Sequence, residues 1–287
     1  MSGNKSKQDS TSVLDSIKDN LNSTGIFLES YVYDFFVKQG HYGVQREVSY
    51  GINVGLGDPL DGECDIVASA KLDEDTVVCF VVECKRAQAE QKYWVFEKGH
   101  LGPSPHPLLT YVLPANNATF RDDIHLSDLG YMKPDDYESA INIYEFDIKL
   151  GRRASNLDKR ERAFIALRQV NEAFSGLAVG PHKALEIAHN TTSKEGLKIL
   201  YLPLVITTAT LLVADYKAED IDYQSGSILD NKKINLNEKG WVHFEFPLSG
   251  ALRTHYGEYT KRPTFVVNVN SMPDFITFVE NAAKTYM

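Results

Sequence analysis

Residues 77–87, VVCFVVECKRA, constrain the fold of this chain more than any other stretch, because an apolar run ends abruptly in charged residues. The first six residues are β-branched, aromatic or cysteine, which is typical of a strand buried on both faces of a sheet. A buried strand normally ends at a turn residue such as Gly or Asn. This one continues into ECKR, and burying a carboxylate without a partner is costly. The end of the strand therefore predicts a chemical role.

A second carboxylate is predicted to lie beside the first. The segments ECDIVASAKL and TVVCFVVECK are predicted strands joined by the acidic turn DED. Strand side chains alternate between faces, so Glu83 and Lys85 share one face, and folding the pair about its turn brings Asp65 next to Glu83. The simpler alternative is an ion pair of Glu83 with Lys85 or Arg86 at an exposed strand end. The apolar neighbours of both carboxylates favour a buried site over that alternative.

Two adjacent carboxylates repel each other unless a cation or a proton lies between them. Mg²⁺ prefers oxygen ligands of this kind. A bound divalent ion can stabilise the charge that develops on a phosphate under attack and can help to deprotonate water. The arrangement therefore predicts a centre that cleaves phosphodiester bonds.

The stretches FLESYVYDFF, GECDIVAS and VVECKRA together resemble the PD-(D/E)XK nuclease superfamily, and most closely its Holliday-junction-resolvase and Mrr-like branches. The resemblance implies an α/β protein with a restriction-endonuclease-like core, a mixed sheet in the element order helix, three strands, helix, strand. The segments that match this order are 22–39, 44–52, 63–70, 76–85, 156–177 and 199–207. The Pro that precedes the Asp in the family is Cys64 here.

By this resemblance, Asp65 and Glu83 bind Mg²⁺, for which Mn²⁺ can substitute, and the main-chain carbonyl of Cys84 is a further ligand. Lys85 positions or activates the attacking water. Glu29 on the first helix either holds a metal-bound water or a second metal, or is a solvated helix carboxylate.

Three regions are expected: a disordered tail at 1–12, a nuclease core at 13–217, and a C-terminal α+β extension at 218–287. The core contains an insertion at about 98–148, whose first part, to residue 135, is rich in Gly, Pro, His and Asn and predicts little regular structure. The extension contains the alternating segment WVHFEFPL and a closing helix. It is expected to complete the sheet, contact DNA or form a homodimer.

A net charge of −9 argues against a protein that coats nucleic acid non-specifically. Locally, residues 149–162 carry six basic and two acidic residues, which predicts either a phosphate-binding surface or a solvated helix face with internal ion pairs. The predicted nucleic-acid contacts are Arg86, Lys149, Arg152, Arg153, Lys159 and Arg160.

The three cysteines lie in apolar strands without C-x-x-C spacing, which favours reduced thiols in a cytoplasmic protein over a zinc site. The chain shows no secretory signal and no apolar segment long enough to span a membrane. We therefore expect a Mg²⁺-dependent DNA endonuclease serving restriction, phage defence or repair. The alternatives are a nuclease of the same fold acting on RNA or branched structures, and a non-catalytic nucleic-acid-binding protein.

Overall fold

The computed structural model of the 287-residue chain describes only part of the sequence. The predicted tail at 1–12 lies outside the described residues. The described residues are 13, 15–18, 21, 24–52, 60–74, 76–87, 93–98, 107–113, 119–125, 139–147, 152–153, 162–179, 197–222, 224–225, 227–229, 234–247 and 261–286.

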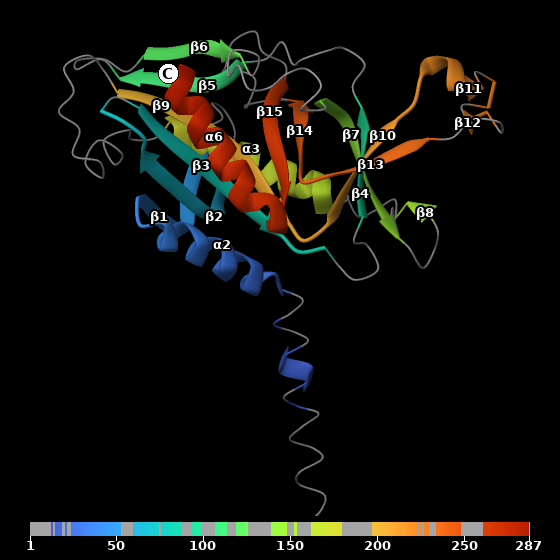
Figure 1. Cartoon of the computed structure of the whole chain (residues 1–287). Helices are drawn as coiled ribbons and strands as arrows, with labels where there is room; N and C mark the ends of the chain where they lie inside the picture. The colour runs from blue at the N-terminus through green and yellow to red at the C-terminus, as the bar shows by residue number, and fades with distance from the viewer. Residues whose placement is uncertain are drawn as a thin grey trace, which may run out of the picture.

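The protein is an α/β protein built on a mixed sheet, as expected (Figure 1). The main sheet runs in the order β1-β2-β3-β9-β15-β14-β7-β4-β10-β13. These strands are β1 (Tyr42–Ile52), β2 (Leu60–Lys71), β3 (Thr76–Lys85), β9 (Leu197–Thr207), β15 (Lys261–Asn268), β14 (Trp241–Pro247), β7 (Ser139–Asp147), β4 (Tyr93–Lys98), β10 (Thr210–Asp215) and β13 (Asn235–Lys239).

The sheet divides into two parts at the contact between β14 and β7. Among the described residues, two residue pairs join these strands, His243 with Ser139 and Phe244 with Ala140. One part contains six strands, and the other contains four. The six-strand part is β1, β2, β3, β9, β15 and β14, and the four-strand part is β7, β4, β10 and β13. At the centre of the six-strand part, β3, β9 and β15 are parallel neighbours. Their carboxyl ends therefore meet at one edge of the sheet.

Helices cover both faces of the six-strand part. The helix α2 (Ile26–Gln39) and the closing helix α6 (Met272–Tyr286) pack on one face, and α3 (Arg162–Val179) packs on the other. Figure 1 shows α6 crossing in front of the sheet and α3 behind it. None of the helices in the described part of the chain is long and apolar enough to cross a membrane.

The strand β3 is buried on both faces, as its apolar run predicts. Phe80 and Val82 belong to the core cluster that contains α2 and α6, whereas Cys79 and Val81 belong to the cluster that contains α3. Burial continues to Cys84, and Lys85 is the first residue of the strand that is partly exposed. The strand therefore extends from the buried core to a charged residue, Lys85, that reaches the solvent.

A buried carboxylate fixes the start of α3. Oε1 of Glu145, on β7, accepts a hydrogen bond of 3.0 Å from the backbone N–H of Ala163 in the first turn. A negative charge at a helix N-terminus is favourable, because the first N–H groups have no partner within the helix. Near its other end, α3 contacts β1, where Gly176 packs against Tyr50.

The expected order of helix, three strands, helix and strand is present as α2, β1 to β3, α3 and β9. The expectation of little regular structure at 98–135 is wrong for two segments. β5 (Pro107–Leu113) and β6 (Thr119–His125) form an antiparallel pair, and β5 also pairs with the first half of β9. The apolar run PLLTYVL forms this strand although Gly-, Pro- and Asn-rich segments surround it.

The C-terminal extension completes the main sheet. Its strand β15 pairs in parallel with β9 over Phe265–Asn268, and β14 pairs antiparallel with β15. A separate small sheet contains β11 (Ile221–Asp222) and β12 (Ser227–Ile228).

Candidate active site

The two predicted carboxylates lie opposite each other at the carboxyl end of β3. The antiparallel pairing of β2 with β3 ends at Ile66 and Val82. The ladder up to this pair has the predicted register, and the next residues on the two strands are Asp65 and Glu83. Beyond this point Oδ2 of Asp65 accepts a hydrogen bond of 2.6 Å from the backbone N–H of Cys84.

The strand β2 is irregular at Asp65. Cys64 packs in the cluster on the α3 face, whereas Ile66 packs on the α2 face. Regular alternation would place both residues on one face. On the neighbouring strand, the pairs Arg46–Ile66 and Val48–Cys64 flank Glu47 and Asp65, which form no pair in the ladder. The two strands are thus distorted at the position where the carboxylate must turn toward β3.

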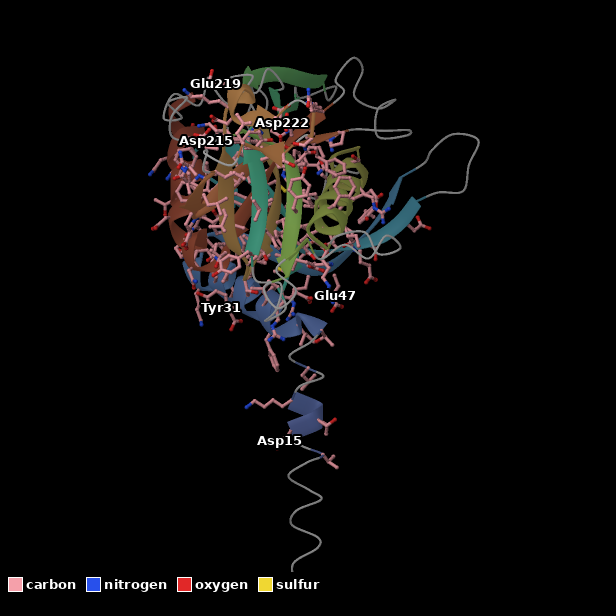
Figure 2. The ribbon with its side chains drawn as sticks, turned by 90° about the vertical axis from the view of Figure 1, so that its right-hand side faces the viewer. Asp15, Tyr31, Glu47, Asp215, Glu219 and Asp222 are labelled. Carbon is pink, nitrogen blue, oxygen red and sulfur yellow. The ribbon has the colours of Figure 1, made fainter. Side chains whose placement is uncertain are left out.

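Glu47 has a φ of 50° and is the only non-glycine residue with positive φ in the described part of the chain. The left-handed conformation costs an ordinary residue roughly 1–2 kcal/mol. Such strain is maintained only where the surrounding structure imposes it, and it gathers at functional sites. In Figure 2, Glu47 is seen at the end of the molecule where α2 lies.

The ammonium of Lys85 is fixed from two sides. Its Nζ donates to Oε1 of Glu83 at 3.2 Å and to Oε1 of Gln169 on α3 at 3.1 Å. The side chain of Glu83 is 5% exposed and that of Lys85 is 27% exposed. The ion pair is therefore largely shielded from water, and the carboxylate and the ammonium are held in a fixed relation.

Glu29 lies in the first turn of α2, is partly buried and faces the same centre. Burial raises its pKa, and the nearby charge of Asp65 raises the pKa further. Arg46 on β1 opposes this rise. The Arg46 guanidinium lies 5.1 Å from the ring centre of Tyr33, and its Nη2 donates to Oγ of Ser30 at 3.3 Å.

The carboxylate pair carries more negative charge than its surroundings compensate. Burial raises the pKa of Glu83 to about 8, with the adjacent Asp65 adding to the rise and Lys85 opposing it. Burial also raises the pKa of Asp65, against the hydrogen bond from Cys84 and the charge of Lys85. In the absence of a cation, the pair therefore favours holding a proton.

This donor set fits a magnesium ion. Among the described residues, no three side chains of His, Cys, Asp or Glu converge closely enough to hold a metal. Mg²⁺ does not require three, because it keeps several waters and is commonly bound through one or two carboxylates. The carboxylates of Asp65 and Glu83 would hold the ion, with the Cys84 carbonyl as the predicted third protein ligand. Their raised pKa values show that this position would accept positive charge.

Of the basic residues predicted to contact nucleic acid, Arg86 is exposed directly after Lys85. Arg152 and Arg153 form the short strand β8, which pairs with β7 on the four-strand part of the sheet. The structure therefore places Arg86 at the candidate site and the β8 pair on the other part of the sheet. The remaining three predicted contacts, Lys149, Lys159 and Arg160, lie outside the described residues.

Tyr50 lies near the carboxylate pair and is held between two glycines. A Cβ added to Gly62 on β2 would lie 2.5 Å from the Tyr50 hydroxyl oxygen, and one added to Gly176 on α3 would lie 2.9 Å from the Tyr50 Cβ. Burial raises the pKa of Tyr50 to about 12, and the nearby carboxylates of Glu172 and Glu83 add to the rise. A cavity of about 520 Å³ opens beside it. Its lining is Ser49, Tyr50, Gly51, Asp61, Gly62 and Glu63.

Three residues at the site were not predicted: Gln169, Arg46 and Tyr50. Gln169 lies three residues after Ala166 and four before Ala173, both in the core, and this helical spacing was the one signal that it faces the sheet. Arg46 and Tyr50 share one face of a predicted strand with Val44 and Val48, and that alternation gives no sign of a role at the site.

The three cysteines are free and buried. Burial raises the pKa of the Cys64 and Cys84 thiols, and the neighbouring carboxylates Asp65 and Glu83 add to the rise. Neutral, buried thiols are poor nucleophiles, so the carboxylates and the ammonium are the better candidates for a chemical role at this site.

No family model, no curated protein and no solved structure matches this chain. The support for any function therefore comes from the residues and their geometry.

Replacing Glu83 with Gln is expected to stabilise the metal-free protein at alkaline pH. The pKa of Glu83 in the folded state, about 8, lies above its ordinary 4.5. Folding stability is consequently lost as the pH rises from about 4.5 to about 8, because the unfolded chain releases this proton more readily. Gln is neutral throughout, so above pH 8 the free energy of unfolding should be greater in the variant, by an amount on the order of a few kcal/mol.

Urea unfolding in EDTA at pH 5 and pH 9 measures this difference. A gap between variant and wild type that is the same at both pH values would contradict the assignment of a raised pKa to Glu83.

Proposed function

We propose that this chain is a metal-dependent nuclease that hydrolyses phosphodiester bonds of DNA, on a restriction-endonuclease-like core. The observation that carries the proposal is the convergence of Asp65, Glu83 and Lys85 where β2 and β3 separate. A carboxylate pair with raised pKa values and an ammonium 3.2 Å from one carboxylate is a donor set that can hold a divalent metal for phosphodiester cleavage.

Each residue of the site has a separate role in the proposed reaction. Asp65 and Glu83 would hold Mg²⁺, which when bound supplies positive charge to the phosphate. Lys85 has three N–H donors, of which Glu83 and Gln169 take two. The third can donate to the attacking water or to a phosphate oxygen. Because both partners fix the ammonium, this donor is positioned before the substrate arrives.

Two further groups support the substrate and the water. The guanidinium of Arg46 is close enough to Asp65 and Glu29 to lower their pKa values, and the exposed Arg86 follows the strand end. Both can neutralise backbone phosphates, contacts that position nucleic acid without reading its sequence. Glu29, with its raised pKa, can accept a hydrogen bond from a water bound at the centre.

The test is cleavage of supercoiled plasmid and linear duplex DNA in Mg²⁺, in Mn²⁺ and in EDTA. We expect nicked and linear products with either metal and none in EDTA. Parallel reactions on RNA and on branched DNA decide the substrate class. A protein that cuts none of these nucleic acids with either metal would disprove the proposal.

A further inference from the structure

A second polar cavity lies at the edge where β9 and β15 end, and no step proposed above uses it. Its volume is about 500 Å³. The turn from β9 to β10, the junction of β13 and β14, and the segment that leads from β15 into α6 surround it. Its polar lining residues are Thr208, Thr210, Glu238, Lys239, Asn268, Asn270 and Ser271.

Hydrogen bonds connect this cavity directly to the candidate active site. In the parallel ladder, Lys85 is the partner of Thr207. The next residue, Thr208, accepts a hydrogen bond of 3.0 Å at Oγ1 from the backbone N–H of Ala87. Across the same turn, Nδ2 of Asn268 donates to the carbonyl of Ala209 at 2.7 Å. The cavity and the end of β3 therefore share one fixed segment of chain.

The separation of the two positions matches the spacing along a nucleic-acid strand. Thr208 lines the cavity one strand from β3 and Asn268 lines it two strands away, and neighbouring strands are about 4.8 Å apart, so the lining extends from roughly 5 to roughly 10 Å from the end of β3. That distance corresponds to one or two nucleotides of a strand lying along this edge.

The chemistry of the lining favours a sugar–phosphate unit. Hydroxyl, amide and ammonium groups are the side chains that contact phosphate and sugar in protein–DNA complexes. Glu238 also lines the cavity, so its charge opposes that of Lys239. The near balance of charge suits a phosphodiester, with a single negative charge, better than a polyphosphate.

The wall of the cavity is closely packed at one point. A Cβ added to Gly240 would lie 2.6 Å from Oγ of Ser271. The junction between β13 and β14 therefore lies against the start of α6, and only glycine permits this approach. The site is built from three elements that meet in fixed positions.

We infer that this cavity binds a sugar–phosphate unit of the substrate strand, one or two nucleotides from the phosphodiester that reaches Asp65 and Glu83. The inference rests on the proposed function and specifies a path for the strand along the carboxyl ends of β3, β9 and β15.

The test measures the affinity of the full chain, in EDTA, for duplex and single-stranded oligonucleotides over a series of salt concentrations. Lys239→Ala removes the cation of the cavity, and Asn270→Asp places a negative charge at an exposed position in its lining. The matched controls are Lys217→Ala, whose side chain is 77% exposed, and Asn237→Asp, exposed on β13.

We expect each cavity variant to bind about 5- to 10-fold more weakly than wild type, and Lys239→Ala to reduce the slope of log K against log salt by about one. The controls should bind as wild type does. Melting temperatures equal to that of wild type show that each variant is folded.

The inference is wrong if the cavity variants bind as tightly as wild type. It is also wrong if the control variants lose as much affinity as the cavity variants. In either case plasmid cleavage by wild type leaves the proposed function standing. A wild-type chain that neither binds nor cuts any nucleic acid overturns both.

Discussion

Lys85→Ala and Asp65→Ala are each expected to reduce metal-dependent DNA cleavage by at least about 100-fold. Lys85 offers the donor that Glu83 and Gln169 hold in place, and removing a positioned proton-transfer or charge-stabilising group typically costs 10²–10⁴-fold in rate. Asp65 is one of the two carboxylates proposed to hold the metal, so its loss removes a proposed metal ligand. The initial rate of plasmid nicking in Mg²⁺ measures both effects.

The same hairpin supplies matched controls. Lys71 and Glu74 are exposed at the opposite end of the β2–β3 pair, and Lys71→Ala and Glu74→Ala should cut at the wild-type rate. Cleavage that survives both site substitutions would mean that another centre, or a contaminating enzyme, is responsible. If both groups act as proposed, replacing Mg²⁺ with Mn²⁺ should not restore cleavage by either variant.

Phe36→Ala is expected to cost about 3–5 kcal/mol of unfolding free energy, the usual range for truncating a fully buried Phe. Phe36 has no exposed surface. Its ring centre lies 4.9 Å from that of Tyr42 and 5.8 Å from that of Phe80, so it joins α2 to β1 and β3. Total stabilities of about 5–15 kcal/mol are usual, so the variant should be only marginally folded.

Urea unfolding followed by circular dichroism measures this loss. Tyr31→Ala is the matched control, because Tyr31 lies on the same helix with 54% of its surface exposed (Figure 2). A surface truncation of this kind should change stability by less than about 0.5 kcal/mol. Equal losses in the two variants would show that α2 does not depend on its buried face.

The pairing of Asp65 with Glu83 could be predicted because it depends on local rules only. Alternation along a strand and the short turn between two strands are enough to set which residues face each other. The burial of β3 was predictable for the same reason, since its residues are apolar on both faces.

Contacts between distant segments could not be predicted in this way. The hydrogen bond of Lys85 to Gln169 joins residues 84 apart in sequence. The place of β15 beside β9 depends on the path of the whole chain. The left-handed conformation of Glu47 arises from the distortion around Asp65, and a Glu within a strand-like sequence gives no local sign of it. β5 was missed because its flanking residues favour loops.

The helix α3 links two regions that the sheet itself joins weakly. Its 18 residues span roughly 27 Å at 1.5 Å per residue. One end is tied to Glu145 in the four-strand part, and the helix holds the Lys85 ammonium through Gln169 along its length. The helix therefore connects the Lys85 ammonium in the six-strand part to Glu145 in the four-strand part, so a shift between the two parts of the sheet would also move Gln169 relative to Lys85.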